Sequence, residues 1–195
     1  MQLVLIRHGK PDISYTDPLS DPPLSGQGRR QAECVAARLV KEGIDRIFSS
    51  PQKRATATAS VLADRLGLPI TTLDGLAEAD RGAARYVSVE QLRENREDWQ
   101  LFLQDPVSFL GGDPVSFRQD VLAAFHSILA AQHAKKVAVF THGIPINVLL
   151  GHALGLATMT GFVPHYCSIS RLVGTSLEAL TVISVNETGH FEPGE

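Results

Sequence analysis

Two short apolar runs, far apart in the chain and separated by helical patterns, constrain the fold most. Residues 2–7 (QLVLIR) and 136–141 (KVAVFT) are rich in aliphatic side chains and have the length of buried strands. Strands that alternate with helices predict an α/β fold, here a three-layer α/β/α arrangement around a mixed, mostly parallel central sheet. Helical patterns cover residues 26–42, 51–66, 88–104, 114–133 and 144–154.

Further strands and loops complete this organisation. Strands are expected at residues 45–49 and 70–73, and residues 168–185 alternate well enough for two more, with antiparallel pairing as an option. Clusters of Pro, Gly, Asp and Ser at residues 18–23 and 105–114 indicate irregular segments.

Length and composition fit one compact domain. The 195 residues include 44% hydrophobic side chains, so we expect a single domain over residues 1–195 with a sizeable core. Within it, residues 82–112 are expected to form a lid-like insertion over one edge of the sheet. The net charge of −3 gives no overall basic field, which argues against nucleic acid as a partner.

Cysteine and histidine spacing bear on compartment and cofactors. Cys34 and Cys167 fit neither a disulfide framework nor a CxxC pattern, and no apolar run has the length of a membrane span. We therefore expect a cytoplasmic protein, either monomer or homodimer, that does not bind membranes. The histidines outside the segments discussed next show no HxH or HExxH spacing, so neither a metal nor another cofactor is expected. These are His126, His133, His152 and His190.

Each of the two apolar runs ends in a His-Gly pair. Arg7 is followed by His8 and Gly9, and Thr141 is followed by His142 and Gly143. In open α/β sheets ligands bind beyond the carboxyl ends of parallel strands, so neighbouring strands would bring both imidazoles to one crevice. A single His in this position is more often an ordinary loop residue, but two in the same setting favour a site.

A third segment adds a basic residue at the start of a helix. Ser50 is a plausible N-cap and Pro51 a first-turn residue, which puts Arg54 in the first turn. A helix N-terminus favours anions, and a guanidinium adds donors that match phosphate oxygens. An isolated Arg at this position would more simply be a surface residue that pairs with Asp64 or Glu42.

In this order, the segments resemble the histidine phosphatase superfamily, the phosphoglycerate mutase-like proteins that also include α-ribazole and broad-specificity phosphatases. The resemblance covers nearly the whole chain. Its motifs are Arg7-His8-Gly9, Pro23-Leu24-Ser25-Gly26-Gln27-Gly28, Ser49-Ser50-Pro51 with Arg54 and Thr58-Ala59, Leu76-Ala77-Glu78 with Gly82, Gly111-Gly112-Asp113, Thr141-His142-Gly143, Cys167-Ser168-Ile169-Ser170, and Asn186 with His190.

The resemblance implies roles for individual residues. His8 becomes the residue that is phosphorylated during turnover, and Glu78 the candidate proton donor, with Asp80 as its nearest rival. A neutral imidazole can attack phosphorus in line, while cationic groups offset the charge on the equatorial oxygens. The residues implied in binding the phosphoryl group are Arg7, Arg54, His142, Gly143 and, where many members have Asn, Ser14.

The departures from the family pattern favour a phosphatase over a mutase. The loop after His8 is short, and residues 79–85 replace a bulky basic segment that the glycolytic mutases carry. Lys10-Pro11 stands where a hydroxyl residue is customary, which leaves a non-catalytic phospho-ligand sensor as a third alternative. We expect a metal-independent phosphatase for a small phosphorylated metabolite. Arg81, Arg85 and His165 are candidates for contacting a second anionic group of that substrate.

Overall fold

One mixed sheet of six strands organises the chain. The computed structural model describes residues 1–14, 21–82, 86–131 and 134–191. The strand order is β3-β2-β4-β1-β5-β6, with β3, β2, β4 and β1 parallel to one another and β5 antiparallel to both β1 and β6. The strands are β1 (Gln2–Arg7), β2 (Arg46–Ser49), β3 (Ile70–Thr72), β4 (Lys136–Thr141), β5 (Ile169–Val173) and β6 (Thr181–Glu187). The predicted mixed, mostly parallel sheet is confirmed.

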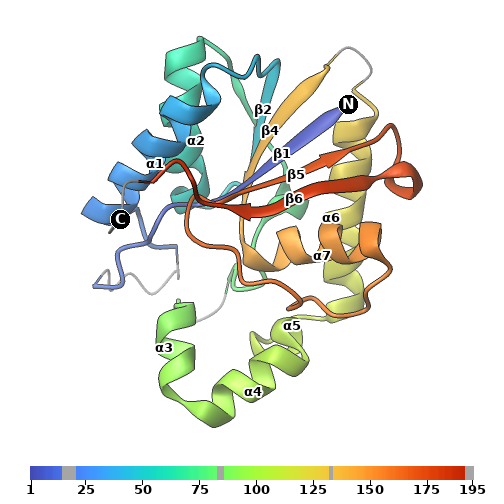
Figure 1. The fold of residues 1–195 in the computed structure, drawn as a ribbon. Helices are drawn as coiled ribbons and strands as arrows, with labels where there is room; N and C mark the ends of the chain where they lie inside the picture. Colours follow the sequence, from blue (N-terminus) through green and yellow to red (C-terminus); the bar gives the residue numbers. More distant parts are fainter. Residues whose placement is uncertain (15–20, 83–85, 132–133, 192–195) are drawn as a thin grey trace.

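Helices cover both faces of this sheet, which confirms the three-layer α/β/α fold. Helices α1 and α2 lie on one face, and α6 and α7 on the other (Figure 1). Helices α3 to α5 lie beyond the carboxyl ends of β1 and β4, and two 3-10 turns cover Asp74–Leu76 and Leu177–Ala179. The α-helices are α1 (Gly26–Leu39), α2 (Lys53–Leu66), α3 (Val89–Glu94), α4 (Arg96–Gln104), α5 (Pro106–Phe109), α6 (Pro114–Leu129) and α7 (Gly143–Leu154).

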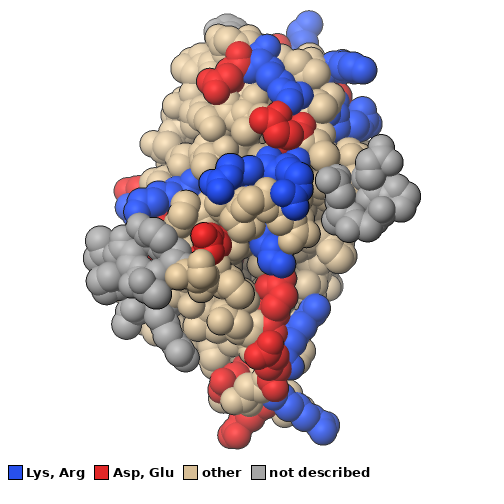
Figure 2. All heavy atoms as spheres, turned by 90° about the vertical axis from the view of Figure 1, so that its left-hand side faces the viewer, with Lys and Arg blue, Asp and Glu red and all other residues tan. Residues whose placement is uncertain are grey.

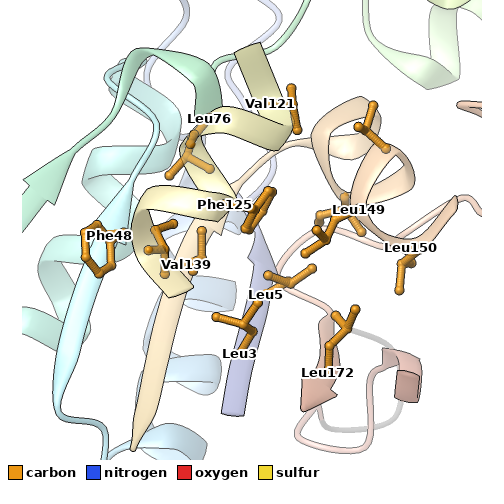
Figure 3. Close-up of a cluster of buried hydrophobic side chains, with 14 of the residues drawn as sticks. Leu3, Leu5, Phe48, Leu76, Val121, Phe125, Val139, Leu149, Leu150 and Leu172 are labelled. Carbon is orange, nitrogen blue, oxygen red and sulfur yellow. The ribbon is translucent and has the colours of Figure 1, made fainter. Parts of the chain in front are cut away.

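The central strand β1 supplies side chains to both layers of the core. Successive residues of a strand point to opposite faces, so Leu3 and Leu5 pack with α6 and α7, as Figure 3 shows, while Val4 and Ile6 pack with α1 and α2. All four side chains are fully buried. Burying an aliphatic side chain of this size stabilises the fold by about 1.5–3 kcal/mol, so both layers hold β1, and hence its carboxyl end, in place.

The expected single helix over residues 88–104 is wrong, because Asn95 divides it. The Asn95 side chain accepts hydrogen bonds from the backbone N–H groups of Glu97 and Asp98, and these bonds cap a new helix, α4. Asp105 caps the short helix α5 in the same way, inside the segment predicted to be irregular. Residues 21–23 of the predicted loop at residues 18–23 lie in no helix or strand, as predicted, and residues 18–20 lie outside the described residues.

The surface of the described residues carries charges of both signs. Basic and acidic side chains are interspersed on the face formed by α1 and α2 (Figure 2). None of the described helices combines the length and the apolar character needed to cross a bilayer.

Candidate active site

The two His-Gly pairs meet at one end of the sheet. β1 and β4 are parallel neighbours whose register pairs Arg7 with Thr141, so the chain leaves both strands at the same edge. The ring centroids of His8 and His142 lie 4.9 Å apart, and their exposed fractions are 2% and 0%. The structure therefore brings together the two imidazoles that the sequence predicted to converge.

His8 holds an imidazole with one nitrogen free for chemistry. Its Nδ1 lies 2.7 Å from the carbonyl oxygen of Gly9, and because a carbonyl only accepts, Nδ1 carries the ring proton. Burial and then the positive charges of Arg54 and Arg7 lower the pKa of His8 well below its usual value. The ring is therefore neutral near pH 7 and keeps a lone pair on Nε2, as a nitrogen nucleophile requires.

Ser50 fixes the orientation of His142. The Ser50 Oγ lies 2.8 Å from Nε2 of His142 and accepts a hydrogen bond from the backbone N–H of Gln52 at 3.2 Å. When the hydroxyl donates to Nε2, the ring proton is on Nδ1, a buried atom with no hydrogen-bond partner among the described residues. His142 can then donate from Nδ1 to a ligand oxygen.

The expected N-cap role of Ser50 is wrong. α2 begins at Lys53, with Gln52 at the cap position, so the helix starts two residues later than the sequence pattern predicted. The Ser50 hydroxyl is used by His142 instead. Arg54 nevertheless lies in the first helical turn, as predicted.

Two buried guanidinium groups keep unused donors. Arg54 is fully buried, and its Nη2 donates to both carboxylate oxygens of Asp80 at 2.9 Å. Its Nε and Nη1 have no hydrogen-bond partner among the described residues, although Nη1 lies 3.6 Å from Oδ1 of Asp21. Arg7 donates from Nη1 to the carbonyl of Pro164 at 2.7 Å, and its Nε is likewise unpartnered in the described chain. Because a buried unpaired donor is costly, these groups are suited to bind an oxyanion.

These contacts exclude the alternative interpretation of Arg54 as a surface residue. Its partner is Asp80, and neither Asp64 nor Glu42 forms an ion pair with it in the described chain. Asp80 itself is 3% exposed and also accepts a hydrogen bond from the Gln52 side chain at 2.9 Å. Asp80 therefore acts as the ion-pair partner of Arg54, which leaves Glu78 as the carboxylate without an ion pair in this part of the described chain.

Glu78 is placed by three neighbouring segments. Its backbone N–H donates to Oε1 of Gln52 at 2.7 Å, and the Thr141 hydroxyl donates to the carbonyl of Leu76 at 2.7 Å, which fixes the loop to the end of β4. Its Oε2 accepts from the backbone N–H of Ile144 at 3.2 Å. Burial, followed by the negative charge of Asp80, raises the pKa of Glu78 to about 7.

Glycines allow the loop after β1 to lie close to the start of α1. A Cβ on Gly9 would lie 2.5 Å from the carbonyl oxygen of Gly28, and one on Gly28 would lie 2.1 Å from that of Lys10. The loop after β1 therefore rests directly on the first turn of α1. At Gly143, a Cβ would lie 3.7 Å from Oε2 of Glu78, so this residue opens α7 beside the candidate acid.

Two contacts of the site were not predicted from the sequence, although Thr58 was quoted there as part of a motif. Thr58 accepts a hydrogen bond from the backbone N–H of Gly9 at 3.0 Å and ties the His8 loop to α2. Its spacing of four residues from Arg54 places both on one face of α2, a signal that the sequence does contain. Tyr166 lies under Arg7, with 4.0 Å between the guanidinium carbon and the ring centroid, and nothing in the sequence pattern indicated this contact.

Other predicted contacts are not brought into this cluster. Ser14 is exposed and donates its hydroxyl proton to Oδ1 of Asp12 at 2.6 Å, so the structure gives no support for a phosphate contact from it. Arg81 is about half exposed and pairs with Asp74 on the surface. His165 is also exposed. Arg85 lies outside the described residues, as does His133.

The described residues contain no cluster of potential metal ligands. Over residues 1–14, 21–82, 86–131 and 134–191, no group of three or more His, Cys, Asp or Glu side chains could hold a metal ion. Outside the cluster, His190 lies 3.0 Å from the Cys167 carbonyl, a contact that fits a structural role.

The fold and this cluster define a protein with a buried histidine pair beside guanidinium donors that have no hydrogen-bond partner among the described residues. The model of the histidine phosphatase superfamily, branch 1, matches residues 3–188, and the chain belongs to this family. The resemblance read from the motifs is thereby confirmed.

Relatives of this chain carry both phosphatase and mutase names. Phosphoserine phosphatase 1 of Hydrogenobacter thermophilus is 29% identical over 163 residues, which cover 80% of this chain and 77% of the relative. A probable phosphoglycerate mutase of Proteus mirabilis is 31% identical over 188 residues, which cover 88% of this chain and 84% of the relative. A mycobacterial glucosyl-3-phosphoglycerate phosphatase has the same fold, with a TM-score of 0.77, 22% identity and coverage of 96% and 99%.

Proposed function

We propose that this chain is a metal-independent phosphatase that hydrolyses a small phosphomonoester through a phosphohistidine on His8. One observation carries the proposal: a neutral imidazole with a free Nε2 lies among unpaired buried guanidinium donors. The carboxyl of Glu78, whose pKa is raised to about 7, faces the same cavity as Arg7. Nucleophile, anion cup and acid are the parts that such a reaction needs.

The first step transfers the phosphoryl group to the protein. Nε2 of His8 forms a bond to phosphorus while the bond to the ester oxygen breaks, and protonated Glu78 donates its proton to that leaving oxygen. The free donors of Arg7 and Arg54 bind the equatorial oxygens, whose charge they offset. The products of this step are the alcohol and phosphohistidine.

The second step releases phosphate. Glu78, now a carboxylate, accepts a proton from a water molecule as that oxygen attacks phosphorus, and the bond from phosphorus to Nε2 breaks. His8 returns to its neutral form and Glu78 to its protonated form. Both residues are then ready for another ester molecule.

Hydrolysis of 4-nitrophenyl phosphate in the presence of a chelator tests this proposal. The wild-type chain should release phosphate and, after a rapid quench with labelled ester, should carry the label on His8. The His8→Ala variant should lose both activities, while His126→Ala, which removes an exposed histidine on α6, should keep them. Undiminished hydrolysis by the His8→Ala variant would contradict the proposed nucleophile.

A second candidate function is a mutase, because the Proteus mirabilis relative is named as a probable phosphoglycerate mutase. Isomerisation of a phosphoglycerate without net release of phosphate would support it. The phosphatase is favoured because Arg81, one of the basic residues considered for a second anionic group, pairs with Asp74 on the surface. A phosphate-dependent rise in melting temperature without turnover of any ester would instead indicate a sensor.

A further inference from the structure

A small cavity adjoins the proposed active site and has mainly apolar walls. Its volume is about 60 Å³, and Arg7, Glu78 and Gly143 contribute to its lining. The apolar side chains around it come from α3, from α4 and from the segment that precedes β5. They include Val89, Trp99, Phe102, Leu103, Met159 and Phe162.

The aromatic side chains of the cavity wall pack against neighbouring aromatic rings. The rings of Trp99 and Phe102 stack with centroids 5.8 Å apart, and Phe109 meets Phe102 edge to face at 6.0 Å. Arg93 lies over the Trp99 ring, 5.1 Å from its centroid, and is not among the residues that line the cavity. These contacts hold the rings as a preformed surface.

The polar side chains in the lining have their donors occupied. The Asn147 amide donates to the carbonyls of Gly143 and Phe162, both at 2.9 Å. The Thr160 hydroxyl donates to the carbonyl of Leu103 at 2.8 Å. Neither side chain therefore has a hydrogen left to donate to a ligand in this arrangement.

Positive charge is scarce in the cavity. Among the described residues that line it, Arg7 is the one cation, and its donors are assigned to the phosphoryl group. His165 and Lys10 line a different cavity, on the side of Tyr166 near the end of β6. A carboxylate or second phosphate on the ligand would thus lose its water without gaining a second cationic partner from these described lining residues, which is costly.

We infer that this cavity takes the alcohol half of the substrate, and that this alcohol is compact, uncharged and apolar. The inference rests on the proposed phosphatase function. At about 10–15 Å³ per water-sized position, the volume holds roughly four to six non-hydrogen atoms, about the size of one aromatic ring. The same walls keep water from Glu78, so a ligand that fills them favours the protonated acid beside the leaving oxygen.

The test compares two esters whose leaving groups are both primary alcohols. Benzyl phosphate has an apolar alcohol, whereas O-phosphoserine carries a carboxylate and an ammonium group, so a large difference in kcat/KM reports the pocket rather than leaving-group chemistry. We expect benzyl phosphate to be preferred by about 100-fold or more, since an unpaired charge is rejected at least as strongly as a polar mismatch.

Two variants of α4 test whether the preference for benzyl phosphate depends on the cavity wall. Phe102→Ala should lower kcat/KM for benzyl phosphate by about tenfold or more while changing that for methyl phosphate little, because methyl phosphate does not reach the ring. Leu101→Ala removes a neighbouring side chain that is 48% exposed and does not line the cavity, and it should behave as wild type. Melting temperatures of both variants, compared with that of the wild type, would check that the fold is retained.

The possible outcomes separate this inference from the proposed function. If O-phosphoserine is hydrolysed as well as benzyl phosphate, or if Phe102→Ala leaves the preference intact, the apolar pocket is refuted while the phosphatase stands. If no ester is hydrolysed, the proposed function fails and the inference fails with it.

Discussion

Replacing Glu78 by Gln tests the acid on which the proposed chemistry depends. A group with a pKa of about 7 is half protonated at pH 7, whereas one at its usual 4.5 would be protonated in about 1 molecule in 300. The buried site and the nearby charge of Asp80 therefore increase the acid form roughly 150-fold. The amide side chain in the Glu78→Gln variant would keep the shape and still accept from the backbone N–H of Ile144, but it has no acidic proton to donate.

The expected kinetic effect depends on the leaving group. For an alkyl ester, kcat should fall by about 10²–10⁴-fold, the usual contribution of a positioned acid. For 4-nitrophenyl phosphate the loss should be smaller, because that leaving oxygen needs little protonation. In wild type, kcat/KM for benzyl phosphate should decline tenfold per pH unit above about pH 7, and in Glu78→Gln this decline should vanish. A flat wild-type profile between pH 7 and 9, or full activity in the variant, would refute the assignment.

The same substitution should stabilise the protein in alkaline solution. Below pH 4.5 Glu78 is protonated in both folded and unfolded chains, but between about pH 4.5 and 7 only the unfolded chain releases its proton, so the folded state loses stability as pH rises. The upper limit is about 3 kcal/mol, and since the side chain is half-buried, water screening reduces the expected gain to about 1–2 kcal/mol. Urea unfolding at pH 8 should show this gain for Glu78→Gln, with no gain at pH 4.

Two further substitutions test the frame of the site. Ser50→Ala removes the partner of Nε2 of His142 and should reduce kcat by about tenfold, with a stability cost near 1 kcal/mol, as measured by steady-state kinetics and urea unfolding. Unchanged kcat would show that the orientation of His142 does not depend on Ser50. Gly9→Ala places a Cβ 2.5 Å from the Gly28 carbonyl and should cost about 1–3 kcal/mol, visible as a lower melting temperature. A melting temperature equal to that of wild type would show that the loop shifts freely.

Sequence periodicity was sufficient for the frame of the fold because the key strands are buried on both faces. Continuous apolar runs at β1 and β4 marked the centre of the sheet, and the Gly after each His marked the point where the chain leaves it. The helix boundaries were less accurate because short polar caps decide them. Asn95 separates helices α3 and α4, but the apolar periodicity continues across it, so the sequence pattern indicated a single helix.

Sequence periodicity could not predict which side chains form hydrogen bonds or ion pairs with the site residues. Arg54 was weighed against Asp64, about three turns further along the same helix, and against Glu42, but its partner Asp80 comes from a loop after β3. Loop positions follow no period, so only the packed structure reveals such a contact. The motif register favoured Glu78 over Asp80 as the candidate acid. The hydrogen bonds agree with that choice, because Asp80 is occupied by Arg54 and Gln52.

In the proposed reaction, the charges in the buried cup favour an acid with a raised pKa. Asp80 offsets the charge of Arg54, and the two histidines are neutral, so Arg7 is left as the main uncompensated positive charge. A dianionic phosphate ester bound there exceeds this charge. An ionised Glu78 would add to the excess and oppose binding, whereas a protonated one does not. Because burial raises the pKa of Glu78 to about 7 in the free protein, the proposed reaction would begin with the proton for the leaving oxygen already on this carboxyl in about half of the molecules at pH 7.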